Sequence, residues 1–368
     1  MKRKLTAGTI SVIGYCYLFL LAGCGQDSAD NSPSESPIPC DTLSAEVVIG
    51  EMMGDSSYVF GEIAAAVPTE GSGVAVLDIY GCDISFFDST GTFIRSIGGR
   101  GDGPGEFLLP LDFAILEDGR IAVVDLVKRR IDILSNEGEL LNSLNTDYAM
   151  LPFSMAAVSD STFMIYYYST RPGEGGFDMG FNLEIWNTSG LQDEIWSWRS
   201  EYTGTDFMFS PGYITCCGEN GKVYYSSMDN RQFFIDYTDI TDGGSGRITA
   251  EAESTEADSS DVGYIEPKVY VNYNVGDTPV DLESESLRYR PQIGAMGVDS
   301  QGRLWVRRGT SDAEDWLIFD ESNEIVGTGT ITGIPEEGRL NYVINRHGAV
   351  AWAPFTDEYP RIYLLSAD

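Results

Sequence analysis

One histidine, His347, is the first residue to weigh for catalytic chemistry in this 368-residue chain. A Ser-His-Asp arrangement needs a histidine that moves a proton between the nucleophile and the leaving group, so any such arrangement would have to include His347. The residue lies in Asn345-Arg-His-Gly348, which is typical of a turn between two strands. No Cys-x-x-Cys pair is present, which disfavours a structural zinc site. The sequence therefore offers no complete catalytic arrangement.

Carboxylates are the other abundant reactive group, and calcium is the metal that they would suit. Calcium takes oxygen ligands from Asp, Glu and Asn side chains. Several of the acids, such as Asp78, Asp125 and Asp320, follow directly on an apolar strand. An Asp in that position commonly accepts hydrogen bonds from the backbone N–H groups of the next turn. We favour this turn role and expect no bound cofactor, with Ca²⁺ as the alternative.

Positive charge is scarce, because 23 Lys and Arg residues stand against 57 Asp and Glu residues, for a formal net charge of −34. Such a charge repels nucleic acid, so no nucleic-acid partner is expected. Against this background Arg288, Arg290, Arg307 and Arg308 could line a mouth that accepts an anionic ligand. Alternatively, these arginines pair with local carboxylates such as Glu283, and we favour this interpretation for the four of them.

The elements that must position these residues form a repeat. Each copy has an apolar strand, a turn, a strand that ends in Asp, a loop, a strand that ends in Phe-Asp or similar residues, a turn with glycine, and a last strand. Copies recur with a period of roughly 40 to 50 residues, which is the range of propeller blades. The six copies contain the segments 73–95, 118–141, 161–190, 220–236, 300–320 and 346–365.

A propeller blade is a twisted sheet that cannot bury both of its faces alone, and stacking the blades in a ring buries them. The sixth copy has only three strands, whereas the apolar segment 45–49 precedes the first copy without a partner of its own. We therefore predict an all-β fold: a six-bladed β-propeller of four-stranded antiparallel blades over residues 42–368, closed by an N-terminal strand that completes the last blade. Stacked hairpins or a β-sandwich are the alternatives.

The copies resemble NHL-type repeats, and the chain from about residue 45 to residue 368 resembles bacterial six-bladed propeller lipoproteins. The resemblance is carried by residues 93–107, Phe-Ile-Arg-Ser-Ile-Gly-Gly-Arg-Gly-Asp-Gly-Pro-Gly-Glu-Phe, and by residues 297–307. It implies the fold and says little about activity. Some lactonase-type propellers hold Ca²⁺ in the channel, so the resemblance keeps a Ca²⁺-dependent lactonase or hydrolase as the alternative function.

An export signal occupies residues 1–23. Three basic residues at 2–4 precede an apolar stretch at 10–21 that is too short to span a membrane stably. The stretch ends in Leu-Ala-Gly-Cys24, which resembles a bacterial lipobox, in which Cys24 is lipidated and becomes the new N-terminus. Gly25 rather than Asp follows, so the usual inner-membrane retention signal is absent. We expect membrane lipid as a partner through the acyl anchor, at the outer membrane of a bacterial cell envelope.

Two segments depart from the repeat. Residues 24–41 are rich in Ser, Pro, Asp and Glu without an apolar period, which predicts a disordered tether. Residues 249–290 are interpreted as an insertion between the fourth and fifth blades. An exported protein permits disulfides, and a Cys40–Cys82 bridge near the ring closure and free buried thiols both stay open. The cysteines after Cys24 are Cys40, Cys82, Cys216 and Cys217.

Long loops on a rigid scaffold are where binding usually resides. In a propeller the blade-to-blade loops share one face with the loops between second and third strands. By this interpretation the face collects the segments 98–106, 126–130, 169–179, 202–210, 249–290 and 309–315. We predict that it binds a protein or a small anionic ligand, on a monomeric, membrane-anchored binding or scaffold protein without catalysis of its own. The candidate ligand-binding residues are Arg100, Arg171, Tyr202, Phe207, Arg288 and Arg290.

Overall fold

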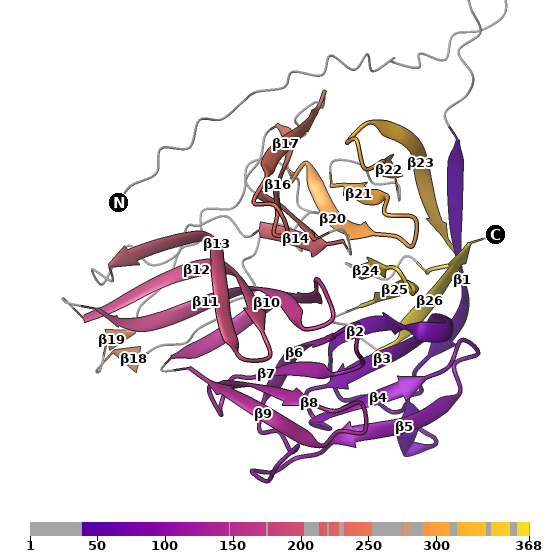
Figure 1. Ribbon diagram of the computed structural model, residues 1–368. Coiled ribbons are helices and arrows are strands. Elements are labelled where there is room, and N and C mark those ends of the chain that lie inside the picture. The colour runs from indigo at the N-terminus through magenta and orange to yellow at the C-terminus, as the bar shows by residue number, and fades with distance from the viewer. Residues whose placement is uncertain are drawn as a thin grey trace, which may run out of the picture.

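The computed structural model forms a ring of β-sheets (Figure 1). The only helical segments among the described residues are the 3₁₀ turns η1 (Ser56–Tyr58) and η2 (Glu70–Ser72). None of the described helices is long and apolar enough to cross a membrane. The structure describes residues 39–146, 148–173, 176–201, 213–218, 221–227, 232–251, 274–275, 278–279, 290–309, 315–335, 340–353 and 359–367.

Four sheets of four consecutive antiparallel strands form the first four blades. Blade 1 contains β2 (Ile63–Thr69), β3 (Gly73–Asp78), β4 (Asp83–Phe87) and β5 (Phe93–Gly98). Blade 2 contains β6 (Pro110–Ile115), β7 (Ile121–Asp125), β8 (Arg130–Leu134) and β9 (Leu140–Asn145). Blade 3 contains β10 (Ala149–Ala157), β11 (Thr162–Gly173), β12 (Gly176–Asn187) and β13 (Gly190–Glu201). Blade 4 contains β14 (Tyr213–Cys217), β15 (Lys222–Ser227), β16 (Phe233–Asp239) and β17 (Ser245–Ala250).

The last two blades share one eight-stranded sheet, and they complete the six-bladed β-propeller that the repeat predicts. Blade 5 contains β20 (Ile293–Val298), β21 (Leu304–Arg308), β22 (Asp315–Phe319) and β23 (Ile325–Thr332). Blade 6 contains β24 (Asn341–Asn345), β25 (Gly348–Trp352), β26 (Ile362–Ala367) and β1 (Cys40–Ile49). A two-stranded sheet of β18 (Asn274–Val275) and β19 (Thr278–Pro279) falls between β17 and β20 in the chain.

The N-terminal strand β1 closes the ring, as predicted. It pairs antiparallel with β26, from Ala45 opposite Leu365 to Ile49 opposite Ile362. Its first residues also pair in parallel with β23, Cys40 lying opposite Thr328, so β1 joins the outer edges of blades 5 and 6. The predicted tether through residue 41 is therefore two residues too long. Backbone pairing to an edge strand needs no apolar side chains, so the start of β1 has no alternating pattern to reveal it.

The apolar residues gather between the blades rather than in one central core. The described residues form six clusters, and each lies between two neighbouring blades. The inner strands β2, β6, β10, β14, β20 and β24 contact one another in this order around the ring, and β24 returns to β2. Middle strands such as β3 are buried along their whole length, because both of their faces meet a neighbouring blade.

Glycine turns separate the strands. Gly91 and Gly138 occupy the same position in the turns after β4 and β8, with φ of 78° and 85°. An L side chain rarely adopts this left-handed conformation, whereas glycine does so at little cost. Asn323 takes the equivalent position after β22 with φ of 66°, and asparagine is one of the few residues that tolerate it.

The two faces of the ring are different. The loop face carries the blade-to-blade connections and the loops between second and third strands, such as 99–109 and 126–129. The turn face carries the short turns such as 116–120 and 135–139. The predicted insertion falls in the connection from β17 to β20, and most of its residues lie outside the described ranges.

Candidate functional site

The sequence nominated six ligand-binding residues, and the structure describes Arg100, Arg171 and Arg290. Tyr202, Phe207 and Arg288, like Cys24, the predicted lipidation residue, lie outside the described residues. Of the three described arginines, Arg100 lies in the connection from β5 to β6, Arg171 lies on β11, and Arg290 comes three residues before β20. They therefore lie in three separate parts of the ring.

Arg100 and Arg290 have separate surroundings. Arg100 is exposed in the glycine-rich crossing, and its Nη2 donates to the backbone oxygen of Tyr80 at 3.2 Å. Gly98 suits the crossing, because a Cβ there would lie 2.6 Å from the buried ring of Phe107. Arg290 is buried and interacts with other residues.

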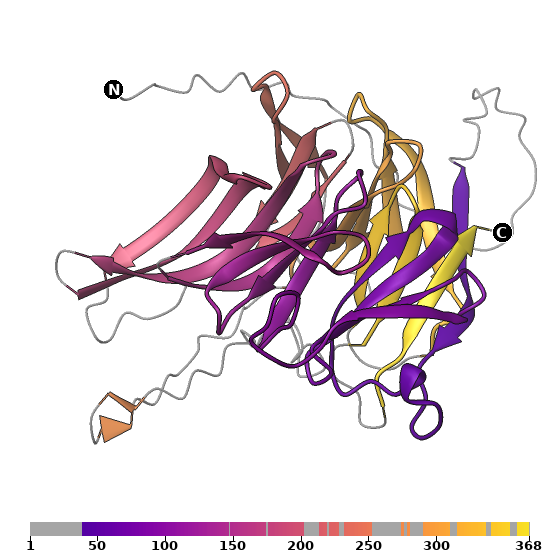
Figure 2. The ribbon, with the colours of Figure 1, turned by 60° about the horizontal axis from the view of Figure 1, so that its bottom comes forward.

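Blade 3 is built differently from the other blades. Strands β11, β12 and β13 have twelve residues each, whereas β7 and β8 of blade 2 have five. The extra residues lie on the loop face, since the β11–β12 hairpin turns there, and they lengthen it by about 20 Å at ~3.3 Å per residue. Figure 2 shows this sheet projecting beyond the rest of the ring.

The predicted loop at 169–179 is therefore wrong. Residues up to Gly173 belong to β11 and residues from Gly176 belong to β12, paired with Ser169 opposite Gly180 and Arg171 opposite Asp178. The segment contains Pro172 and two glycines, which are typical of a loop. Backbone pairing continues through these residues, and it does not need the alternation of apolar and polar side chains that marks a half-buried strand.

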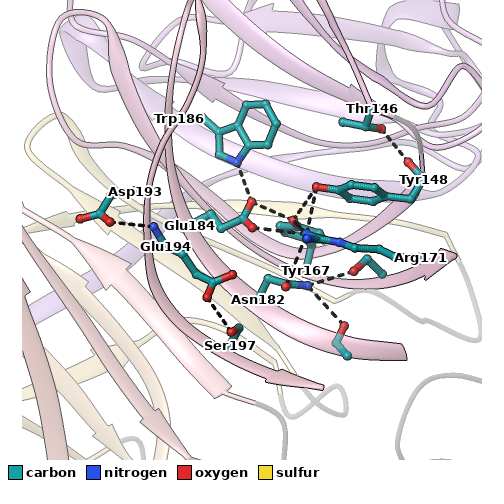
Figure 3. Close-up of polar contacts among 12 residues, drawn as sticks. Thr146, Tyr148, Tyr167, Arg171, Asn182, Glu184, Trp186, Asp193, Glu194 and Ser197 are labelled. Carbon is teal, nitrogen blue, oxygen red and sulfur yellow. Dashed lines mark hydrogen bonds and ion pairs between the residues drawn. The ribbon is translucent and has the colours of Figure 1, made fainter. Parts of the chain in front are cut away.

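Arg171 lies at the base of this extension in a polar cluster. Its Nη2 donates to the hydroxyls of Tyr167 (2.6 Å) and Tyr148 (2.9 Å) and lies 3.4 Å from Oε1 of Glu184. The guanidinium also lies over the ring of Tyr148, with Cζ 4.1 Å from the ring centroid. Figure 3 shows these side chains converging from β11, β12 and the connection before β10.

Glu184 is the buried anion of the cluster, with 1% of its side chain exposed. Its Oε2 accepts hydrogen bonds from the Tyr167 hydroxyl (2.7 Å) and from Nε1 of Trp186 (3.0 Å). A buried carboxylate is costly unless it is paired and hydrogen-bonded, and here both conditions are met. Beside it the buried Asn182 donates to Oγ of Ser169 at 3.0 Å.

The electrostatics of the cluster keep Arg171 charged and Tyr167 protonated. Burial alone lowers the pKa of Arg171, but the phenols of Tyr167 and Tyr148 and the Glu184 carboxylate outweigh it, and the pKa is raised. Burial, and then the negative charge of Glu184, raise the pKa of the Tyr167 hydroxyl far above its usual range. The cluster therefore holds a charged arginine beside a protonated Tyr167 hydroxyl.

Sequence reasoning identified Arg171 but missed the residues that hold it. Every second residue of a strand lies on the same face. One face of β11 therefore carries Tyr167, Ser169 and Arg171, and one face of β12 carries Asn182, Glu184 and Trp186. The available signal was the acid inside the apolar run Leu183-Glu-Ile-Trp186. Without the register of β11 on β12, that acid had no identifiable partner.

The Asp residues that end β3 and β7 hold turns, as predicted. The Asp78 carboxylate accepts hydrogen bonds from the backbone N–H groups of Gly61 and Tyr80, each at 2.8 Å. Asp125 accepts in the same way from Leu108 at 2.7 Å. These hydrogen bonds confirm the turn role at both positions.

The remaining predicted turn residues follow the same pattern. Asp320 accepts from the backbone of Ser322 (2.9 Å) and Glu324 (3.0 Å). His347 lies in the turn between β24 and β25, where its backbone N–H donates to Oδ1 of Asn345 at 2.8 Å. Within the described ranges, no group of three or more His, Cys, Asp or Glu side chains is arranged to hold a metal ion.

A separate carboxyl, Asp112, lies on the inner strand β6. It accepts hydrogen bonds from the backbone N–H groups of Phe113 (2.8 Å) and of Met155 on the inner strand of blade 3. Its side chain keeps some contact with solvent but is surrounded by packed strands, and burial raises its pKa to about 7. Asp112 therefore links two inner strands.

The four described cysteines are free thiols, so the Cys40–Cys82 bridge considered above is not formed. Cys40 is exposed on β1, whereas Cys82 is buried and its Sγ donates to the backbone oxygen of Ile79 at 3.3 Å. Cys216 and Cys217 point to opposite faces of β14, into the clusters on either side of blade 4. Burial raises the pKa of the Cys217 thiol to about 12.

Comparison with known proteins supports the fold. Residues 59–217, which cover blades 1 to 3 and β14, match a family model described as "DUF5128: 6-bladed beta-propeller". No match to a curated protein sequence was found.

Several solved structures are similar at low sequence identity. A member of the DUF4221 family from Bacteroides vulgatus is 12% identical, with 89% of this chain and 98% of that chain covered and a TM-score of 0.49. Virginiamycin B lyase from Staphylococcus aureus is 12% identical (87% and 98% covered, TM-score 0.38). The calcium-binding protein regucalcin from Agrobacterium tumefaciens is 8% identical (89% and 96% covered, TM-score 0.42). Likenesses at this level carry no argument about activity.

Proposed function

We propose that this six-bladed β-propeller is an exported binding protein, anchored by lipid at Cys24 in a bacterial cell envelope, which recognises a protein or a small anionic ligand through its loop face without catalysis of its own. The observation that carries the proposal is the extension of blade 3. A hairpin that rises about 20 Å above its neighbours breaks the symmetry of the ring on this face, at ~3.3 Å per residue.

The base of this extension supports a recognition role. Arg171 is one of 23 cations in a chain with 57 acids, and it is held in place by Tyr148, Tyr167 and Glu184 rather than left free in solvent. Fixing a side chain before a ligand arrives lowers the entropy lost on binding. About 21% of the Arg171 side chain remains exposed, so its charge stays accessible to a partner.

The direction of β1 supports an anchored arrangement. Because β1 runs parallel to β23, and β23 runs from the turn after β22 toward the loop face, Cys40 lies at the turn face. A chain anchored at Cys24 would therefore approach the ring from the turn face. The loop face, with the extension of blade 3, would then point away from the membrane and toward a partner.

The test uses the full mature chain and a partner identified by crosslinking in the native envelope. In one variant Thr170 is joined to Met179 by Asn-Gly, which suits a two-residue hairpin turn, and the extension is shortened. We expect this variant to lose partner binding, while Lys222→Glu on the turn side of blade 4 keeps it. Equal losses in both variants, or hydrolytic turnover that requires Ca²⁺, would overturn the proposal.

Anchoring is tested separately. Replacing Cys24 by Ser removes the lipid attachment residue, so the protein should leave the detergent phase and lose the mass of its acyl chains. A single acyl chain binds a membrane only reversibly, whereas several hold it firmly. Unchanged partitioning and unchanged N-terminal mass in the variant would show that Cys24 is not lipidated.

A further inference from the structure

Within the described part of the chain, the guanidinium of Arg171 has hydrogen-bond partners on one side only. Among the described residues all of its hydrogen bonds come from Nη2, which faces the hydroxyls of Tyr148 and Tyr167, Oδ1 of Asn182 and Oε1 of Glu184. Its Nε is buried, yet it has no hydrogen-bond partner in the described part of the chain. An arginine has five N–H donors in a planar fork, so a large share of this donor capacity is unused.

Arg130 of blade 2 also pairs with a buried acid, but its Nε has a hydrogen-bond partner. Arg130 is 20% exposed and Asp132 is 0% exposed, close to the 21% and 1% of Arg171 and Glu184. Arg130 nevertheless uses both Nε (3.0 Å) and Nη2 (2.8 Å) on Oδ2 of Asp132. The two pairs have matched burial and differ in whether Nε is satisfied.

A buried donor without a partner is costly. Leaving one unsatisfied costs about 1–3 kcal/mol, and an acceptor that arrives with a ligand recovers that cost. The carboxylate of Glu184 cannot supply this acceptor, because its oxygens already face Nη2, Tyr167 and Trp186. The missing acceptor must come from outside the cluster.

We propose that the Nε side of Arg171 is a binding subsite for a carboxylate, whose oxygen accepts the Nε hydrogen beside the ring of Tyr148. The inference deepens the proposed function and rests on its placement of recognition at the loop face. It names the ligand group as a carboxylate, carried on a small molecule or on a peptide side chain.

Charge selects a carboxylate over a phosphate group. Glu184 already neutralises Arg171, and the whole chain has a formal charge of −34. A phosphate group carries about −1.5 to −2 charges at neutral pH, so it meets more repulsion here than a singly charged carboxylate. The carboxylate also matches the planar guanidinium fork in shape.

The experiment observes the Nε hydrogen directly in the wild-type mature chain. Protein with ¹⁵N-labelled arginine is titrated with sodium acetate at constant ionic strength, and the Nε–H resonances of Arg171 and Arg130 are followed by NMR. Arg171→Lys and Arg130→Lys identify the two signals. We expect a saturable downfield shift at Arg171 and none at Arg130, and a weaker response of Arg171 to inorganic phosphate.

Calorimetry of acetate binding supplies a second measurement that does not depend on a visible Nε–H signal. Arg171→Lys keeps the charge but loses the planar fork, and the loss of one hydrogen bond to a charged group should weaken acetate binding about tenfold or more. Arg130→Lys should leave binding unchanged. Equal responses of Arg171 and Arg130, no saturation at Arg171, or tighter binding of phosphate than of acetate would each overturn the subsite.

The subsite and the proposed function can fail separately. Saturable acetate binding at Arg171, together with partner binding that survives the shortened hairpin, would keep the subsite and reject recognition by the extension. Loss of partner binding in the shortened hairpin, with no acetate response at Arg171, would keep the proposed function and reject the subsite.

Discussion

Oε1 of Glu184 lies 3.4 Å from Nη2 of Arg171, and the two side chains come from neighbouring strands of blade 3, which projects beyond the rest of the described ring. The acid is buried and the arginine is partly exposed, so the pair joins the closed interior of blade 3 to its accessible end. A buried ion pair of this kind contributes little net stability while both partners are present. Removing one partner is strongly destabilising, because it leaves the other charge buried without a counterion.

Glu184→Ala should therefore lower the free energy of unfolding by about 3–5 kcal/mol, because Arg171 loses its counterion and Tyr167 and Trp186 lose their acceptor. Glu194→Ala, at an exposed position on β13, is the control and should change it by about 0.5 kcal/mol or less. Urea unfolding of the mature chain followed by tryptophan fluorescence measures both. Similar values for the two variants would show that the cluster does not stabilise blade 3.

The Asp112 carboxyl should make stability depend on pH in an identifiable window. Its pKa is near 3.8 when unfolded and about 7 when folded, so folding retains a proton between these values. The contribution of Asp112 to stability is therefore constant below about pH 4, falls as pH rises toward 7, and is constant above. By this linkage the loss reaches at most about 4 kcal/mol.

Asp112→Asn removes this titration. The free energy of unfolding of Asp112→Asn minus that of wild type should be larger at about pH 7.5 than at about pH 4.5. These two pH values cover most of the window of about pH 4 to 7 in which wild type loses stability. The comparison uses chemical unfolding at both pH values, with Asp193→Asn on the exposed edge strand β13 as the control. A difference between Asp112→Asn and wild type that does not change with pH would contradict the raised pKa.

Removing β1 should open the ring, whereas removing only the segment before it should not. A chain that begins at residue 39 keeps all of β1, so its free energy of unfolding should equal that of the mature protein. A chain that begins at residue 50 loses the pairing with β23 and β26 and the buried Ile49 side chain, which alone is worth about 1.5–3 kcal/mol. Equal midpoints for the two truncations in thermal unfolding would show that β1 does not close the ring.

Thiol reactivity should separate the cysteines by burial. In the folded mature chain with Cys24→Ser, Cys40 should react rapidly with a thiol reagent because it is exposed. Cys82, Cys216 and Cys217 should react slowly, since burial raises the pKa of each thiol and keeps it protonated. Cys40→Ser should abolish the fast phase. Four thiols should react after unfolding without reductant, and a count of two would reveal a disulfide.

The sequence by itself determined the ring and its local chemistry. Six copies of a strand pattern, the unpaired strand at 45–49 and glycine turns such as those of Gly91 and Gly138 predicted the six blades and their closure. Asp78 and Asp125 were correctly assigned to turns. These features depend on strand alternation, on turn conformation and on hydrogen bonds to the next turn, all of which act over a few residues and leave a direct mark in the sequence.

Tertiary structure alone decided which distant side chains meet. The start of β1 at Cys40 and the continuation of β11 through Gly173 depend on backbone pairing, which has no residue signature. Glu184 reaches Arg171 only because of the register of β12 on β11, and a shift of one residue would place the acid on the opposite face. The raised pKa of Asp112 likewise depends on the packing of blade 3 against β6, because burial is a property of all the strands that surround a group.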